Sequence, residues 1–184
     1  FFLNFALTVR INMFSLLFHS LAYVLNKIQL FQHESLAMPA SNSGKVRIIG
    51  GRWKRTNIPV LNADGLRPTG DRQRETLFNW LSFLLGGFEG RSALDMFGGS
   101  GALSFEFLSR DGSRAVLCET NRRAAQFIEQ TAEKLHAEGL TVIVGNALTD
   151  VRIADFAPYD LAFIDPPFAA DLQLKALKRC VPML

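Results

Sequence analysis

The sequence predicts an α/β protein with a doubly wound parallel sheet. Short apolar runs alternate with stretches of helical periodicity, which is typical of parallel strands joined by helices. The predicted strands cover residues 92–97, 114–118, 140–145 and 159–164. A glycine-rich loop follows the first strand, and a carboxylate or amide side chain lies at or near the end of each one. Because such sheets bind ligands at the carboxyl ends of their strands, these polar residues mark the expected site.

Length and composition fit one globular domain. The chain has 184 residues, of which 48% are hydrophobic and 20% charged, with a formal net charge of +3. Its two cysteines, Cys118 and Cys180, and its three scattered histidines have no metal-like spacing, so we expect no metal site. Free thiols are typical of a reducing cytoplasm. We therefore expect a cytoplasmic monomer without a membrane segment.

Residues 1–44 differ in character from the rest of the chain. The first residue is Phe, and an uncharged run at 11–26 is shorter than the roughly 20 apolar residues that span a bilayer. We expect Met38 to be the natural start and residues 1–44 to be an extension and leader, disordered or translated from upstream. Residues 1–37 should then be dispensable. A helical segment that binds a membrane surface or a partner is the alternative.

A basic segment begins at Lys45. We expect residues 45–184 to form the folded domain. Between residues 45 and 91 there are nine basic and four acidic residues. Residues 45–60 predict a small hairpin that turns at Gly50 and Gly51. Basic residues around a Trp suit a phosphate backbone and a stacked base, although a solvated face with a core Trp is the alternative. The candidate RNA contacts are Arg47, Arg52, Trp53, Lys54, Arg55, Arg67 and Arg72.

Helices are predicted between these features by periodicity and by their end signals. The first covers residues 72–85; Thr69 or Asp71 caps it and Gly86 ends it. The next covers 102–110, and a third covers 122–138 with Gly139 as its stop. Shorter helices are expected near 148–155 and 171–179.

The loop Gly98-Gly99-Ser100-Gly101 allows close approach of the backbone to a ligand. It does not complete a dinucleotide fingerprint, because Ser104 stands where the third glycine is required. Asp95 precedes the loop, and a carboxylate there repels a pyrophosphate but attracts an ammonium group. The pattern therefore favours the methionine end of S-adenosylmethionine over a dinucleotide.

Two further strand ends extend this predicted cofactor site. Glu119 lies where an acidic residue binds ribose hydroxyls in this architecture, although an ordinary strand-end acid is equally consistent with the sequence. Asn146 and Ala147 follow the third strand, where an adenine edge would be read. The expected cofactor-binding residues are Asp95, Phe97, Gly98, Gly99, Ser100, Gly101, Glu119, Asn146 and Ala147.

The tetrapeptide Asp165-Pro166-Pro167-Phe168 follows the last predicted strand. Asp165 brings a carboxylate, the prolines stiffen the loop and leave carbonyls free as acceptors, and Phe168 offers a flat face. An exocyclic amino group on a nucleobase needs acceptors for its hydrogens and a platform for its ring. A rigid turn between strand and helix is the alternative.

Together these residues resemble the bacterial 16S rRNA guanine-N2 methyltransferase family. The marks are residues 47–51, 66–69, 71–72, 74–81 and 95–103 and the tetrapeptide. The resemblance implies a Rossmann-like fold, S-adenosylmethionine as cofactor, and 16S rRNA or the small ribosomal subunit as partner. Gly70 departs from the family pattern, and the chain stops before the strands that close the family's sheet. The latter predicts a domain that is incomplete at its C-terminus.

The resemblance also implies a mechanism. A guanine leaves its stack, Asp165 and the Pro166 carbonyl accept its N2 hydrogens, and Phe168 stacks on the ring. Two other functions remain open on the sequence. One is methylation of adenine N6 or cytosine N4 in DNA, and the other is a non-catalytic RNA-binding fragment.

Overall fold

The computed structural model describes residues 6–9, 44–60, 70–166 and 170–184 of the chain. Within these ranges five strands form one sheet in the order β1-β7-β4-β5-β6. Four of them are mutually parallel: β4 (Ser92–Asp95), β5 (Arg114–Glu119), β6 (Leu140–Val144) and β7 (Leu161–Ile164). Helices alternate with these strands, which confirms the predicted Rossmann-like α/β fold.

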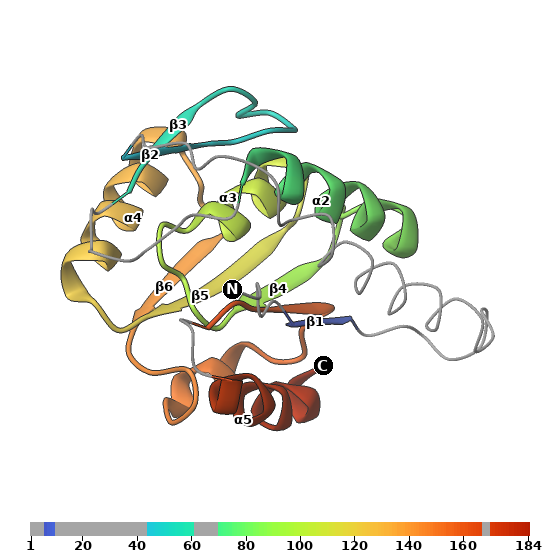
Figure 1. The fold of residues 1–184 in the computed structure, drawn as a ribbon, viewed down its shortest axis with the longest axis vertical. Helices are drawn as coiled ribbons and strands as arrows, with labels where there is room; N and C mark the ends of the chain where they lie inside the picture. The colour runs from blue at the N-terminus through green and yellow to red at the C-terminus, as the bar shows by residue number, and fades with distance from the viewer. Residues whose placement is uncertain (1–5, 10–43, 61–69, 167–169) are drawn as a thin grey trace.

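Helices lie on both faces of the sheet (Figure 1). One face carries α2 (Asp71–Leu85), α3 (Ala102–Ser109) and α4 (Arg122–Leu135). The other carries α5 (Ala170–Cys180) and the 3₁₀ helix η2 (Val151–Phe156), and a second 3₁₀ turn, η3 (Val181–Met183), follows α5. The predicted helix positions are thus confirmed to within a few residues.

Alternate residues of each of the four parallel strands enter two different hydrophobic cores. In β5, Ala115 and Leu117 pack with the cluster that also contains Phe78 of α2, whereas Val116 and Cys118 pack with the cluster of Ala176 and Cys180 in α5. Side chains of successive strand residues point to opposite faces. A parallel strand covered on both faces therefore needs a continuous apolar run, which is the pattern that identified these strands in the sequence.

The order of the strands creates a switch point beside β4. The chain proceeds from β4 to β5 to β6 in one direction, and then returns to place β7 on the other side of β4. Asp95 is in register with Leu117 of β5 and with Phe163 of β7. Glu119 and Asp165 therefore each lie two residues beyond the level of Asp95. The carboxyl ends of strands at such a point are where open α/β sheets bind ligands.

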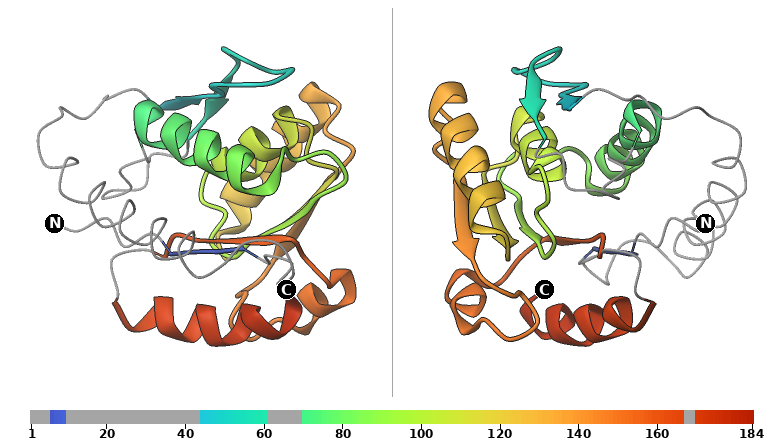
Figure 2. Two further views of the ribbon diagram at one scale, coloured as in Figure 1. Left: turned by 90° about the vertical axis from the view of Figure 1, so that its right-hand side faces the viewer. Right: turned by 60° about the vertical axis from the view of Figure 1, so that its left-hand side comes forward.

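A separate two-stranded hairpin packs over the helices of the first face. It consists of β2 (Lys45–Arg47) and β3 (Asn57–Pro59), and confirms the predicted hairpin. Ile48 and Ile58 are buried in the same core as Phe78. Figure 2 shows the hairpin beyond α3, on the side away from the sheet.

The N-terminal region differs from the expectation for residues 1–44. Ala6–Val9 forms strand β1, which pairs antiparallel with β7 from Ala6↔Ile164 to Val9↔Leu161. The expectation of disorder is therefore wrong for these four residues, because the edge of β7 offers backbone groups for a strand to pair with. Residues 10–43 lie outside the described ranges. In the part of the chain that the structure describes, no helix is both long and apolar enough to cross a membrane.

Two helix ends also differ from their predictions. Gly70, not Thr69 or Asp71, is the N-cap of α2, and its N–H donates to Gln73 Oε1 at 3.1 Å. Helix α4 ends at Leu135, where His136 caps it with a left-handed φ of 50°, rather than continuing to Gly139. The Ala137 N–H then donates to Ala132 O at 2.9 Å, and Ala137 is buried in the core, so tertiary packing ends this helix three residues early.

Candidate active site at the switch point of the sheet

Asp95 is a carboxyl group buried at the end of β4, with an exposed fraction of 1%. Its Oδ2 accepts a hydrogen bond from the Ser104 hydroxyl of α3 at 2.8 Å. Its Oδ1 has no hydrogen-bond partner among the described residues. Buried polar atoms are rarely left without a partner, so this oxygen is a candidate ligand contact.

Burial raises the pKa of Asp95 to about 7. The Ser104 hydrogen bond and the polarity of the nearby Phe97 backbone act in the opposite direction, and the charges of Asp165 and Glu119 add to the rise. Those last two effects show that three carboxylates meet at this edge of the sheet. A site with three acidic side chains attracts a cationic ligand and disfavours a pyrophosphate.

The glycine loop folds tightly against the ends of β4 and β5. Gly98 donates its N–H to Cys118 O at 2.8 Å, and a Cβ there would collide with the Leu117 side chain. Gly101, the N-cap of α3, has a φ of +76°, which a larger residue adopts only with strain. Phe97 packs against the core beneath the loop and Ser100 is half-buried within it. The loop therefore presents backbone rather than side chains to a ligand.

Glu119 connects this loop to the end of β5. Its Oε2 accepts the Gly99 N–H at 2.7 Å, and its Oε1 accepts the Asn121 N–H at 2.7 Å. The Thr120 hydroxyl also donates to Oε1, at 3.4 Å, so of the two oxygens Oε2 retains capacity for a further donor.

Asn146 follows β6 two residues beyond Val144, which is in register with Glu119. Its Oδ1 accepts the Leu148 N–H at 3.0 Å, and its side chain is exposed. Ala147 is buried in the hydrophobic core that also contains Cys118 and Ile143, and this packing holds the turn in place. The structure thus places Asn146 on the same edge as the three carboxylates, one strand further from β4.

Asp165 and Pro166 are the described part of the tetrapeptide. Asp165 is half-buried and Pro166 is buried directly after β7. Side chains of alternate strand residues point to the same face of the sheet. Phe163, two residues before Asp165, packs in the core under α2 and α3, and so does Ala93, two residues before Asp95. Asp165 and Asp95 are therefore on the same side of the sheet. The predicted residues Pro167 and Phe168 lie outside the described residues, as does Arg67 of the RNA-binding set.

The remaining predicted RNA contacts form two groups. Arg52, Lys54 and Arg55 are exposed at the tip of the hairpin. Arg47 and Arg72 are exposed near the start of α2, where Arg47 makes an ion pair with Asp71 at 2.9 Å.

Trp53 differs from the other members of that set. Its ring packs edge-on against Phe105 at a centroid distance of 6.4 Å, and the Arg52 guanidinium lies 4.3 Å from its centroid. It is half-buried against the first core. Its contacts therefore favour a structural role for the ring, the alternative that the sequence left open.

Sequence reasoning missed two side chains that position these groups. Ser104 was visible only as the residue that breaks a dinucleotide fingerprint, yet its hydroxyl binds Asp95. Glu106 is fully buried and binds backbone groups of the hairpin more than 50 positions away, a contact with no local signal. Among the described residues, no group of three or more His, Cys, Asp and Glu side chains is arranged to hold a metal ion.

Comparison with known proteins gives consistent matches. A family model described as Conserved hypothetical protein 95 matches residues 46–183. Ribosomal RNA small subunit methyltransferase D of Escherichia coli K12 is 42% identical over 132 residues, which are 72% of this chain and 65% of that protein. The protein of the same name from Haemophilus influenzae is 40% identical over 137 residues, covering 73% and 69% of the two chains.

A solved structure agrees with these sequence matches. A provisionally assigned methyltransferase from Escherichia coli superposes with a TM-score of 0.64 at 36% identity. The superposition covers 74% of this chain and 72% of that one. The chain thus spans about two thirds of the length of the relatives that it matches.

Proposed function

Because the chain belongs to the family described as Conserved hypothetical protein 95, which includes ribosomal RNA small subunit methyltransferase D, we propose that it methylates ribosomal RNA. The proposed reaction is transfer of a methyl group from S-adenosylmethionine to the exocyclic N2 of one guanine in the 16S rRNA of the small subunit. One observation carries the proposal: Asp95, Glu119 and Asp165 gather beside the glycine loop at the switch point of the sheet.

The charge of this site supports S-adenosylmethionine as the cofactor. Its sulfonium and ammonium groups are cationic, and the site offers acidic side chains, among them Asp95, whose Oδ1 has no partner within the described ranges. Asp95 would bind the ammonium group, and Glu119 the ribose hydroxyls. Gly98, Gly99 and Gly101 would lie against the ligand, while Asn146 would meet the adenine edge. The bound cofactor supplies an activated methyl group.

The loop after β7 supports a nucleobase amino group as the acceptor. Asp165 and the carbonyl of Pro166 would accept hydrogen bonds from the two N2 hydrogens and orient the nitrogen lone pair, and Asp165 or water would take the one proton that N2 loses on methylation. Phe168 would stack on the base, which must leave its own stack to reach this edge. Holding two reactants in line supplies most of the rate enhancement, so the chain needs neither a covalent intermediate nor a metal.

The position of the hairpin supports a structured RNA as substrate. Its basic tip contacts the second half of α3 through Glu106 and Ser109, whereas the glycine loop precedes the first residue of that helix. Eight helical residues span about 12 Å. The tip would therefore contact phosphates at a distance from the reacting base, as a large folded RNA allows.

Two measurements on the protein test this function. Calorimetry should detect binding of S-adenosylmethionine, and unmethylated small subunits should receive a labelled methyl group that mass mapping places on a guanine N2. Methylation of adenine N6 or cytosine N4 in DNA instead would assign a different substrate. RNA binding without binding of S-adenosylmethionine would identify a non-catalytic module.

A further inference from the structure

Glu106 is a buried carboxylate outside the site at the switch point. It lies in the middle of α3, and its exposed fraction is 0%. Its Oε2 accepts the Ile49 N–H at 2.7 Å, and its Oε1 accepts the Gly50 N–H at 2.8 Å. Arg110 Nε donates to Oε1 at 2.7 Å as well. A buried charge is unfavourable unless hydrogen-bond donors compensate it in this way. The carboxylate of Glu106 therefore favours the one position of the hairpin in which these donors reach it.

The contact between the hairpin and α3 is close at both glycines of the turn, most of all at Gly51, which faces backbone atoms. A Cβ on Gly50 would lie 2.6 Å from the Arg110 guanidinium carbon. Gly51 has a φ of +72°, and a Cβ there would overlap the carbonyl oxygen of Ser109. Gly50 and Gly51 therefore allow the backbone of the turn to come into contact with α3. This contact is the structural role of the two glycines that the sequence predicted as the turn.

Ser109 continues the same contact one turn later. Its hydroxyl donates to Gly50 O at 2.5 Å and accepts the Trp53 N–H at 3.0 Å. Its carbonyl oxygen accepts the Arg52 N–H at 2.8 Å. Glu106 and Ser109 together bind the backbone of residues 49–53, which leads directly into the exposed basic tip.

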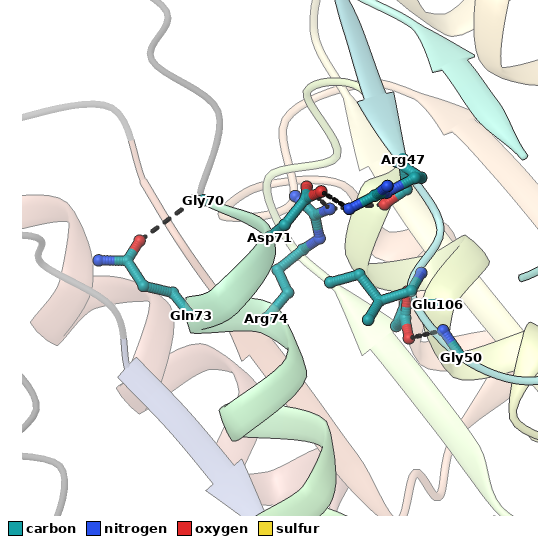
Figure 3. A network of polar contacts seen from close by, with 8 residues as sticks. Arg47, Gly50, Gly70, Asp71, Gln73, Arg74 and Glu106 are labelled. Carbon is teal, nitrogen blue, oxygen red and sulfur yellow. Dashed lines mark hydrogen bonds and ion pairs between the residues drawn. The ribbon is translucent and has the colours of Figure 1, made fainter. Parts of the chain in front are cut away.

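A second buried charge holds the last residue of β2, next to the turn (Figure 3). Arg74 of α2 has an exposed fraction of 1%. Its Nη2 donates to Arg47 O at 2.6 Å and to Asp71 Oδ1 at 2.9 Å, and Asp71 also pairs with the Arg47 side chain. The hairpin is thus bound to α3 at its turn and to α2 at Arg47, the end of β2.

From this arrangement we propose that Glu106 is a positioning residue for RNA engagement, an inference that rests on the proposed function. Helix α3 begins at the glycine loop and carries the hairpin on its second half. The carboxylate of Glu106 therefore fixes where Arg52, Lys54 and Arg55 stand relative to the reacting base, without touching RNA or cofactor. Preorganised cations bind a rigid array of phosphates better than mobile ones, because less conformational entropy is lost on binding.

The test is Glu106→Gln, with Glu133→Gln on the exposed side of α4 as the matched control. A glutamine has nearly the same shape, but its NH₂ group faces one of the two backbone N–H donors and cannot accept from it. We expect affinity for small-subunit rRNA to fall by about tenfold, because the loosened tip must then be ordered when RNA binds. The salt dependence should flatten by about 0.7–0.9 for each phosphate that the tip no longer reaches. Affinity for S-adenosylmethionine should stay unchanged, and Glu133→Gln should alter neither.

Ser109→Ala covers the case in which Glu106→Gln does not fold. It removes two hydrogen bonds of the same contact and keeps the buried carboxylate, so we expect a smaller change in the same direction. A folded variant of either kind with unaltered RNA affinity and salt slope would overturn the proposal. Methyl transfer by the wild-type protein is scored separately, so a failure of the proposed function is distinguished from a failure of Glu106 to position the hairpin.

Discussion

Asp95 shows how one buried side chain couples ligand binding to pH. Burial raises its pKa to about 7, so the free protein holds it protonated in mild acid, whereas a cationic ligand favours the carboxylate. Between pH 5 and 7 we therefore expect affinity for S-adenosylmethionine to rise by up to about tenfold per pH unit. Calorimetry on Asp95→Asn should show this rise abolished. In Ser104→Ala its midpoint should move to higher pH, because the hydrogen bond that this variant lacks favours the carboxylate. An unchanged rise in Asp95→Asn would remove Asp95 from the site.

The same carboxyl group opposes folding at neutral pH. Its pKa is about 7 in the folded state and about 3.9 in an unfolded chain, so between these values the folded state holds a proton that the unfolded state has released. The free energy of unfolding should therefore fall by up to about 4 kcal/mol as pH rises from 4 to 7. Denaturant titrations without ligand check this, and Asp95→Asn should lack that part of the fall. Parallel pH curves for the two proteins would contradict it.

At the scale of elements, the hairpin tip makes a prediction about RNA binding. Removing the charges of Arg52 and Lys54 should weaken binding to small-subunit rRNA and flatten its salt dependence by about 0.7–0.9 per phosphate contact. The matched control removes Lys175 and Lys178, which lie on α5 at the opposite face of the sheet (Figure 1). Filter binding across a range of salt concentrations compares the two. Equal effects of both pairs would mean that overall charge, not the hairpin, determines binding.

Strand β1 makes a second prediction at this scale. Deleting residues 1–37 returns the outer edge of β7 to water, which we expect to cost about 1–3 kcal/mol and to lower the melting temperature by several degrees. Affinity for S-adenosylmethionine should persist, because β4 and β5 hold Asp95 and Glu119. Calorimetric melting and ligand titration check both parts. An unchanged melting temperature would show that β1 contributes nothing to the sheet, and a loss of binding would show that the segment reaches the site.

The elements that the sequence predicted well are those with local signals. Apolar runs located the four parallel strands, and because strand ends meet at one edge, the same pattern located Asp95, Glu119, Asn146 and Asp165. The end of α4 at Leu135 was missed because tertiary packing stops that helix before its glycine. The pairing of β1 with β7 could not be foreseen either, since an edge strand's partner depends on which backbone groups remain free.

At the scale of the whole molecule, one helix connects two predicted sites that are distant in sequence. The glycine loop leads into α3, and the second half of α3 binds the hairpin through Glu106. Sequence patterns suggested each site separately, but not this connection, because contacts across more than 50 residues leave no periodic trace. The packing of Trp53 on Phe105, which favours the structural alternative for this ring, is likewise a long-range contact.

The two aspartates that flank β7 give the most direct test of methyl transfer at the switch point. Asp165 follows the strand at the ligand edge, whereas Asp160 precedes it and binds the Ser92 N–H and Arg91 at the other end. Turnover on unmethylated small subunits should be measured at saturating S-adenosylmethionine. We predict that Asp165→Asn lowers kcat by about 100-fold or more with KM nearly unchanged, as expected for a group that acts mainly in the transition state. Asp160→Asn should lower stability but retain kcat. Near wild-type turnover by Asp165→Asn would contradict the proposed role of this edge in catalysis.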